Sequence, residues 1–404
     1  MSQDTLQRIR TAALELFAAN YYDFVSVAQI CRTAGVSNGV FYRYYPNKET
    51  LFQGLLDEFF ESFSRDLAAI TSPDRHERLV QFISVVSGAV RRYAGEVTMF
   101  RMGQYRKPEY EEQLRLLYLD SARHVLGRDV TEAEYLFLLS GLRFISTRSL
   151  YHDLPIHRDM LLDIVENGLF DQQRTVPLED HKDILSAHEE CTRRNTGSAD
   201  GEDGVDGEGG ADGEGGADGE GGVEGVSGSD QFIEAGIRLF GEHGYFSVQV
   251  SDICRETSFS VGTFYKRFKS KEAFLAMIVH EIGHRTRRFL SCAIPVEGNA
   301  LDREVCGMWN FLAYFGKHRE YYSIVREGEF VVPLAVKEYY DAFEAGYKHT
   351  LGEFSKEKRR DIANFLMGLS HYTGIEILFS DRVSDPRTLI EQIGLLLAQG
   401  LQDP

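Results

Sequence analysis

The chain has 404 residues, 43% of them hydrophobic, and a formal net charge of −18 at pH 7. This hydrophobic content is enough for packed cores, and no apolar run reaches the roughly 20 residues that a membrane span needs, so we expect no membrane association. The N-terminus has no apolar signal core and the five cysteines are scattered without a CxxC pair, which predicts a cytoplasmic protein without disulfides or a metal site.

Residues 1–50 predict a small helical domain. After a first apolar helix, Ser26 and Gln29 have the spacing of a capping box, which opens a short helix. Gly35 predicts a tight turn because glycine accepts a positive φ. A second short helix is expected from about Asn38 to Tyr44. A short helix, a turn with glycine and a second short helix together indicate a helix-turn-helix, which places its second helix in the major groove of DNA.

Residues 51–194 predict a larger helical domain. Pro46 ends the preceding helix, and Asn47 caps a long helix that has a wide stripe of Leu and Phe. Four or five further helices are expected, one of them opened by a capping box of Thr131 and Glu134.

Residues 195–229 interrupt the helical pattern. Between Ser198 and Ser229 there are ten acidic residues and no Lys or Arg, in repeats of DGEGG with a six-residue period. Such a segment cannot bury enough surface to offset its ordering entropy, which predicts a flexible linker with a typical reach of roughly 30–35 Å. Calcium binding is disfavoured, since an EF-hand loop closes with a Glu at position twelve and is flanked by helices.

After the linker, the pattern of the first domain returns. The segment at 25–49 aligns without a gap with the segment at 248–272, 223 positions later, and eleven positions carry the same residue. Internal repeats of this kind decide the architecture. We therefore expect residues 230–273 to form a second helix-turn-helix domain and residues 274–404 a second larger helical domain.

The repeat extends beyond the helix-turn-helix. Arg101–Tyr105 (RMGQY) matches Arg326–Phe330 (REGEF), and Leu139–Leu142 resembles Met367–Ser370 more loosely. The predicted fold class is therefore all-α, with two tandem units that each contain a three-helix domain with a helix-turn-helix and a larger helical domain.

Each repeat resembles bacterial transcriptional repressors of the tetracycline-repressor (TetR) family, over about 50 residues. The family pattern G-x-x-Y-x-x-F-x-x-K-E-x-L is matched at Gly39, Tyr42, Tyr45, Lys48, Glu49 and Leu51, and again at Gly262, Tyr265, Phe268, Lys271, Glu272 and Phe274. Two positions depart from the pattern: Ser258 stands where the first repeat has Gly35, and Tyr21 stands where glycine is usual.

The predicted DNA-binding residues lie on and beside the second helix of each helix-turn-helix. They are Ser37, Asn38, Gly39, Val40, Tyr42, Arg43 and Lys48 in the first repeat, and Ser260, Val261, Gly262, Thr263, Tyr265, Lys266, Arg267 and Lys271 in the second. The resemblance implies that the Tyr and Lys residues common to both sets contact phosphates and that residues 38–43 and 261–267 contact bases. Phe41 and Phe264 are expected to face the core.

The local charge of the two helix-turn-helix segments suits DNA binding better than the net charge of the whole chain does. Residues 1–50 carry five basic side chains against four acidic ones, and residues 251–272 carry five against three. DNA affinity depends on the local basic face rather than on net charge. An open possibility is that the acidic linker competes with DNA for these faces.

The resemblance also implies that the remaining helices form a dimer interface, here intramolecular, and a pocket for a small effector. The candidate pocket residues are Arg101, Tyr105, Arg143, His152, Trp309, Tyr314, Arg326, Glu329, His371 and Tyr372, although each is also explained as a core or surface residue. The high aromatic content favours an apolar effector, and no cofactor is implied.

The sequence thus predicts a transcriptional regulator that binds a double-stranded DNA operator as a single-chain pseudo-dimer and is released by a small effector. Repression is the expected direction. The alternatives are a further homodimer with four DNA-binding domains, and a small-molecule sensor in which one or both DNA-binding domains are degenerate. An enzyme is not expected, because no catalytic motif has its required context.

Overall fold

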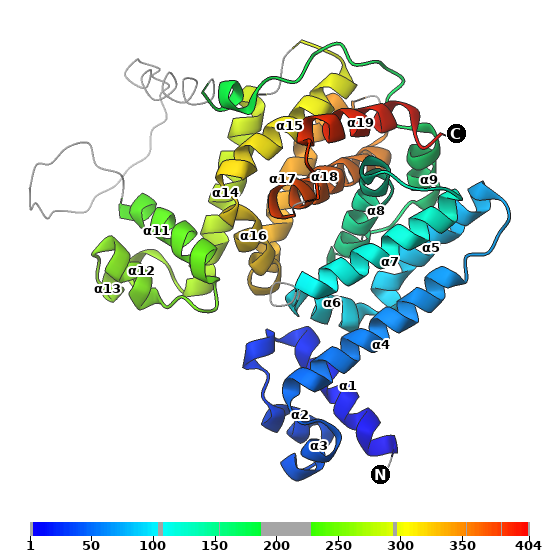
Figure 1. The fold of residues 1–404 in the computed structure, drawn as a ribbon. Helices are drawn as coiled ribbons and strands as arrows, with labels where there is room; N and C mark the ends of the chain where they lie inside the picture. The colour runs from blue at the N-terminus through cyan, green and yellow to red at the C-terminus, as the bar shows by residue number, and fades with distance from the viewer. Residues whose placement is uncertain are drawn as a thin grey trace, which may run out of the picture. The chain divides into compact units, whose positions relative to one another are not determined.

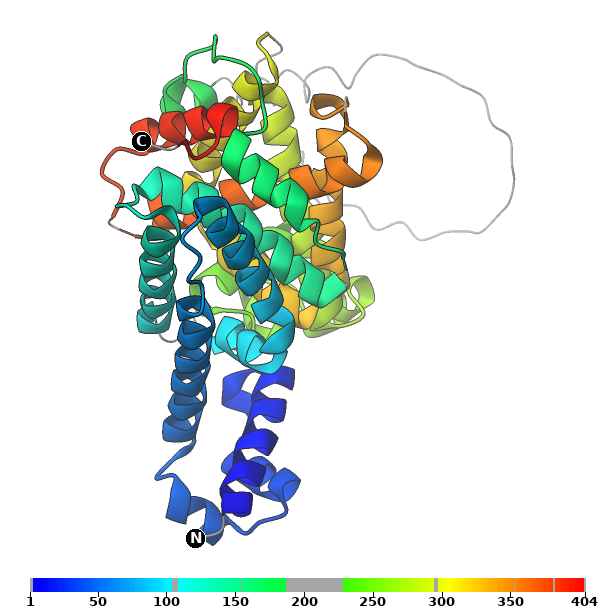
Figure 2. The ribbon, with the colours of Figure 1, turned by 90° about the vertical axis from the view of Figure 1, so that its right-hand side faces the viewer.

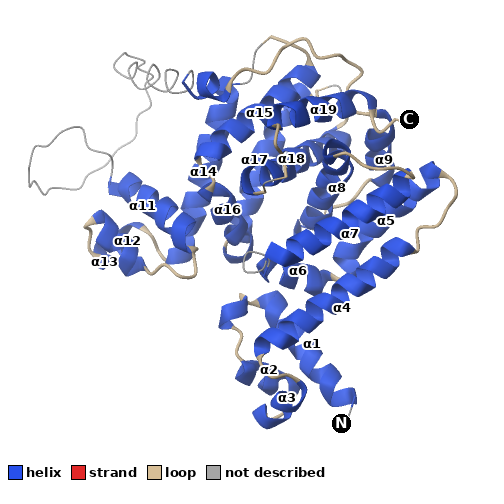
Figure 3. Cartoon of the chain, in the orientation of Figure 1, coloured by secondary structure: helices blue, strands red, loops and turns tan. Residues whose placement is uncertain are grey.

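The computed structural model describes residues 3–103, 108–152, 154–186, 228–293, 297–352, 354–380 and 382–402. These residues are helical with no strand, which confirms the predicted all-α class (Figure 3). None of the helices in these ranges is long and apolar enough to cross a membrane. Tyr105 and nearly all of the predicted linker lie outside the described residues.

The chain forms two compact units. Unit 1 comprises Met1–Thr175, Asn299–Val305 and Tyr347–Pro404, and unit 2 comprises Val176–Gly298 and Cys306–Gly346. Unit 1 therefore combines the first repeat with the C-terminal helices of the second.

The first repeat folds into a series of helices of different lengths. They are α1 (Gln3–Ala19), η1 (Tyr22–Phe24), α2 (Val27–Ala34), α3 (Asn38–Tyr44), α4 (Lys48–Ala68), α5 (Arg75–Arg92), α6 (Ala94–Gly103), α7 (Pro108–Leu126), α8 (Glu132–His152) and α9 (Arg158–Asn167). Helix α4 links the DNA-binding domain to the larger domain (Figures 1 and 2), and its stripe of Leu and Phe is buried. The predicted boundary at residue 50 falls within this helix and stays a prediction.

The α-helices of the second repeat follow the same order as those of the first. They are α11 (Gly228–His243), α12 (Val250–Thr257), α13 (Val261–Arg267), α14 (Lys271–Ala293), α15 (Ala300–Lys317), α16 (Glu320–Val331), α17 (Pro333–Thr350), α18 (Lys356–Phe379) and α19 (Pro386–Gln399). The predicted boundary at residue 273 falls within α14 and likewise stays a prediction.

Within unit 1, α8 of the first repeat crosses α18 of the second at a pair of glycines. Gly368 lies 227 positions after Gly141, and a Cβ built on Gly368 would lie 3.0 Å from the Cα of Gly141. Three residues further on, the rings of Phe144 and His371 are 6.0 Å apart. Because equivalent residues of the two repeats meet each other, a local pseudo-two-fold axis passes close to this crossing.

A second pseudo-symmetric contact joins the ends of α9 and α19. The backbone N–H of Leu169 donates to the carbonyl of Leu397 at 2.7 Å, and the N–H of Leu401 donates to the carbonyl of Val165 at 2.8 Å. Each donor and each acceptor has its equivalent 232 positions away in the other repeat. We call this reciprocal pair of hydrogen bonds the backbone clasp.

Two glycines make the backbone clasp possible. Gly168 has φ 80° and ψ −174°, and Gly400 has φ 69° and ψ −172°. Only glycine readily adopts this conformation. The backbones also approach closely, since a Cβ on Gly168 would lie 2.7 Å from the carbonyl carbon of Ala398.

Candidate nucleic-acid interface

The first DNA-binding domain is built from the local signals that its sequence contains. The Ser26 side chain accepts a hydrogen bond from the N–H of Gln29 at 3.2 Å, and the Gln29 side chain accepts from the N–H of Ser26 at 2.7 Å. This is the predicted capping box. Gly35 ends α2 with φ 65°, and Ser37 then caps α3 by accepting from the N–H of Val40.

One buried aromatic ring fixes the orientation of each recognition helix. Phe41 in α3 and Phe264 in α13 are both 0% exposed, as predicted, whereas the next residue in each helix, Tyr42 or Tyr265, is more than half exposed. Because each buried ring is held in the core of its domain, the opposite face of each short helix is directed to solvent.

The predicted DNA-binding residues of the two recognition helices lie on these solvent-facing surfaces. The exposed ones are Ser37, Asn38, Gly39, Tyr42 and Arg43 in the first domain, and Ser260, Val261, Gly262, Tyr265, Lys266 and Arg267 in the second. Val40 and Thr263 are half-buried. The Nη1 of Arg267 donates to the Ser229 hydroxyl at 2.6 Å, which ties this guanidinium to the start of α11. The contacts of these predicted DNA-binding residues with DNA stay predictions.

Ser258 takes over the turn that Gly35 makes in the first domain. It ends α12 in the left-handed region with φ 58°, and its N–H donates to the carbonyl of Arg255. The substitution therefore leaves the backbone path of the turn unchanged. Its cost is conformational, because the left-handed region is unfavourable for a residue with a Cβ.

We expect Ser258→Gly to stabilise the second domain by about 1 kcal/mol, because it removes this strain. The converse change, Gly35→Ser, is expected to destabilise the first domain by more. A Cβ at Gly35 would also lie 2.8 Å from the Nη2 of Arg8. Urea unfolding of the two variants checks both signs, and equal effects of the two changes would contradict this explanation.

Lys48 and Lys271, predicted to contact phosphates, are turned toward their own domains. Lys48 Nζ donates to the carbonyls of Tyr22 and Val25, both at 2.8 Å, and lies 4.0 Å from the centre of the Tyr22 ring. Lys271 Nζ donates to the carbonyl of Tyr245 at 2.6 Å and lies 4.0 Å from that ring. Burial lowers the pKa of Lys271. Both ammonium groups thus hold the segment between the first two helices of their domain.

This geometry separates two roles for Lys48. If it holds its own domain together, Lys48→Met is expected to lower the free energy of unfolding by about 1–3 kcal/mol, because two partly buried carbonyls lose a charged donor. If it mainly contacts a phosphate, the same change leaves stability unaltered and reduces the salt dependence of DNA binding by about one ion. We expect the first result. Thermal unfolding without DNA is the measurement.

Two contacts were missed by the sequence analysis because they join distant segments. Arg8 donates from Nη2 to the carbonyl of Gly35 at 2.9 Å and so supports the turn of the first domain. In the second domain, the carboxylate of Glu327 in α16 accepts from the N–H of Tyr245 at 2.6 Å. Burial raises the pKa of Glu327. Gln231 stands at the position equivalent to Arg8, so the two domains are supported differently.

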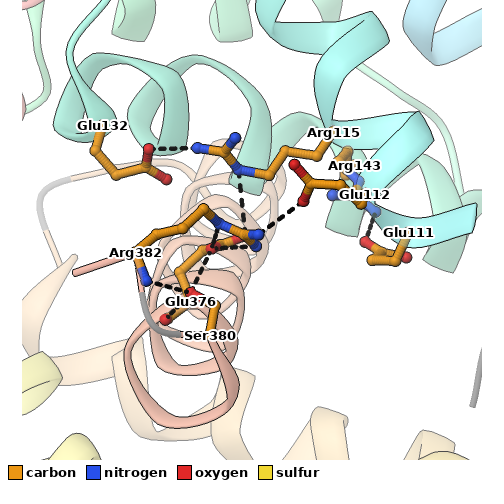
Figure 4. A network of polar contacts seen from close by, with 8 residues as sticks. All are labelled: Glu111, Glu112, Arg115, Glu132, Arg143, Glu376, Ser380 and Arg382. Atoms are coloured by element: carbon orange, nitrogen blue, oxygen red, sulfur yellow. Dashed lines mark hydrogen bonds and ion pairs between the residues drawn. The ribbon is translucent and has the colours of Figure 1, made fainter. Parts of the chain in front are cut away.

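Among the pocket candidates, Arg143 and His371 lie in one neighbourhood. Arg143 donates to Glu111 at 3.0 Å (Figure 4), and its guanidinium carbon lies 4.4 Å from the centre of the Tyr372 ring. The ring of His371 is 5.2 Å from that of Tyr372. Burial raises the pKa of Tyr118, a further neighbour of Arg143, to about 12.

The remaining described candidates are placed elsewhere. Arg101 lies over the ring of Tyr151 at 5.2 Å in unit 1. Trp309, Tyr314 and Arg326 belong to unit 2. There the Trp309 indole donates to the carbonyl of Glu179 at 2.7 Å. Tyr314 is buried and stacks on Phe289 at 4.5 Å between ring centres. These candidates therefore do not form one cluster within a single unit.

Comparison with known families finds the same domain twice. The model of the N-terminal domain of bacterial regulatory proteins of the tetR family matches residues 9–55 and 232–278. A curated relative, the uncharacterised HTH-type transcriptional regulator YuxN of Bacillus subtilis (strain 168), is 24% identical over 197 residues. That alignment covers 44% of this chain and 66% of the relative, just under two thirds of its length.

Two solved structures of regulators from Bacillus species have weak overall similarity to part of this chain. FadR of Bacillus subtilis in complex with stearoyl-CoA is 18% identical, with a TM-score of 0.36, over 43% of this chain and 98% of that chain. The fatty acid degradation regulator FadR of Bacillus halodurans is 18% identical, with a TM-score of 0.38, over 45% of this chain and 100% of that chain.

Proposed function

Because this chain belongs to the tetR family of bacterial regulatory proteins and carries the family's N-terminal domain twice, we propose that it represses transcription as a single-chain pseudo-dimer. Its two DNA-binding domains bind the two half-sites of one operator. The half-sites are centred about one helical turn, 34–36 Å, or a small multiple apart. A small effector releases the protein from the operator.

The observation that carries the proposal is the backbone clasp together with the glycine crossing. Both contacts join equivalent residues of the two repeats within unit 1. A homodimeric regulator achieves two-fold symmetry with two chains, and its operator mirrors that symmetry. One chain with two repeats can meet the same requirement alone.

The differences between the recognition helices shape the operator. Asn38, Val40 and Arg43 in the first domain correspond to Val261, Thr263 and Lys266 in the second. Base contacts specify sequence, whereas phosphate contacts mainly fix register. We therefore expect an imperfect palindrome whose two half-sites differ in sequence.

For the effector we favour an apolar molecule near Arg143 and Tyr372. The charge of Arg143 is already matched by Glu111, and its other neighbours are the rings of Tyr372 and Tyr118. Such surroundings suit an aromatic or aliphatic ligand better than an anion. We place the protein in the cytoplasm, where the free thiols of Cys31, Cys254, Cys292 and Cys306 are stable.

The proposal is tested by DNase footprinting on the DNA upstream of the protein's own gene. The expected result is one protected region with two dissimilar half-sites and a strong dependence of affinity on salt. Two identical half-sites, each bound equally by both domains, would contradict the assignment of distinct specificities to α3 and α13.

The alternative, a sensor with a degenerate DNA-binding domain, rests on the acidic balance of the chain and on Ser258 at the position equivalent to Gly35. In the second domain Ser258 keeps the left-handed turn, Ser260 caps α13 and Phe264 is fully buried. This geometry supports two competent domains, and we therefore propose that both bind DNA.

A further inference from the structure

The backbone clasp and the glycine crossing do not by themselves decide which repeats pair. Both use glycine and backbone atoms that the two repeats have in common at Gly141, Gly168, Gly368 and Gly400. Two first repeats, or two second repeats, from separate chains could make the same contacts. A preference for the unlike pair must come from side chains that differ between the repeats, and the crossing of α8 and α18 contains such side chains.

A polar pair lies on one side of that crossing. The guanidinium of Arg148 in α8 donates from Nη1 to the side-chain oxygen of Asn364 in α18. The Asn364 amide in turn donates to the carbonyl of Arg360 at 2.7 Å. Arg148 is 5% exposed and Asn364 is 3% exposed. A charge this deeply buried is tolerated only with hydrogen-bonding partners.

The equivalent positions on the other side of the pseudo-axis are apolar. By the 227-residue correspondence of the crossing glycines, Ile375 is the counterpart of Arg148, and Phe137 is the counterpart of Asn364. In a pairing of two first repeats, Arg148 would therefore face Phe137 twice and lose its side-chain acceptor. In a pairing of two second repeats, Asn364 would face Ile375 twice.

The charged network in Figure 4 also lies on one side of the pseudo-two-fold axis. Within the first repeat, Arg115 Nη2 lies 2.6 Å from Glu132 Oε2. Arg115 Nε also lies 3.8 Å from Oε1 of Glu376, which belongs to the second repeat. Arg382 of the second repeat contacts Glu376 at 2.8 Å and Glu112 of the first repeat at 2.7 Å.

The first repeat cannot supply the second repeat's part of this network. It has Ser149 at the position of Glu376 and Pro155 at the position of Arg382. A pairing of two first repeats would therefore leave Arg115 without its contact across the crossing.

We infer that the crossing of α8 and α18 selects the unlike pair, so that a first repeat pairs only with a second repeat, through the Arg148–Asn364 pair and the Arg115–Glu376–Arg382 network. This selection extends the proposed single-chain arrangement and rests on it. It excludes the like pairs that would link separate chains into open assemblies.

Cysteine cross-linking in the full chain tests the selection. Phe144 and His371 occupy equivalent positions beside the pseudo-axis, and Cys191 and Cys292 are first replaced by serine. Three chains are compared: Phe144→Cys alone, His371→Cys alone, and both together. Each is treated with a short bis-maleimide and analysed by denaturing gel and by mass.

The double variant is expected to cross-link within one chain and stay at the 45.8 kDa mass of the monomer, and its yield should exceed that of either single variant by at least about tenfold. Cross-linking of either single variant into a dimer with a similar yield would overturn the selection. A double variant that does not cross-link would overturn the pairing itself.

A second set of variants tests whether the Arg148–Asn364 pair causes the selection. Arg148→Ile with Asn364→Phe gives both sides of the crossing apolar residues. On this background Phe144→Cys alone is expected to give more cross-linked dimer, and an unchanged yield would contradict the role of the polar pair.

The cross-linking experiment needs no DNA, so it distinguishes a failure of operator binding from a failure of the selection. A double variant cross-linked only between chains would contradict the single-chain arrangement and not the selection.

Discussion

Gly400→Ala is expected to lower the free energy of unfolding by about 3 kcal/mol or more, because two costs combine. The backbone at Gly400 has φ 69° and ψ −172°, a conformation essentially restricted to glycine. A Cβ there would also lie 2.6 Å from the backbone nitrogen of Asn167. The methyl group must therefore displace main chain and break the backbone clasp. Urea unfolding followed by circular dichroism measures the loss.

Two other glycines of unit 1 provide graded controls. Gly127→Ala carries only the conformational cost of φ 71°, about 1–2 kcal/mol, since its nearest neighbour would lie 3.5 Å away. Gly88→Ala, in the middle of α5 with nothing within 4 Å, is expected to stabilise by up to about 1 kcal/mol through helix propensity. If Gly400→Ala were no worse than Gly127→Ala, the ends of α9 and α19 would not be in contact.

Arg43→Ala and Lys266→Ala are each expected to weaken operator binding by about ten- to a hundredfold, or ~1–3 kcal/mol. The two side chains are exposed at equivalent positions of α3 and α13, and each is predicted to add a positive charge at the DNA surface. If both domains bind one operator, the double variant should show roughly the sum of the two losses in free energy. Gel-shift titration at several salt concentrations measures this.

The matched control is Arg65→Ala, which removes the same charge from an exposed position of α4 outside the recognition helix. Its affinity should stay close to that of the unaltered chain. A normal affinity for Lys266→Ala combined with a large loss for Arg43→Ala would show that only the first domain binds DNA, and would favour the sensor alternative.

Local sequence signals predicted the DNA-binding domains well. Ser26 with Gln29, Asn47 and Gly35 act within a few residues of their own position, and the structure has these caps and this turn as predicted. The buried Phe41 follows from its place in the repeated pattern. Such local features depend on backbone hydrogen bonding and on φ preference. Both follow from the type of amino acid at the position, so they can be predicted from the sequence.

Contacts between distant segments of the chain could not be predicted from such local signals. The orientation of Lys48 depends on which carbonyls the folded chain presents to it, and the Arg148–Asn364 pair joins residues 216 positions apart. The loose similarity of Leu139–Leu142 to Met367–Ser370 was the available signal for the crossing, since each segment contains a glycine followed by leucine. It could not show that these glycines face each other, because helical periodicity does not specify the partner of a buried face.

We propose that one chain with two DNA-binding domains binds one operator, where a homodimer would use two chains. Light scattering of the complex with a duplex of the footprinted operator, together with the chain alone, tests it most directly. We expect a free chain of 45.8 kDa and a complex of one chain with one duplex. A complex of two chains with one operator duplex would contradict it.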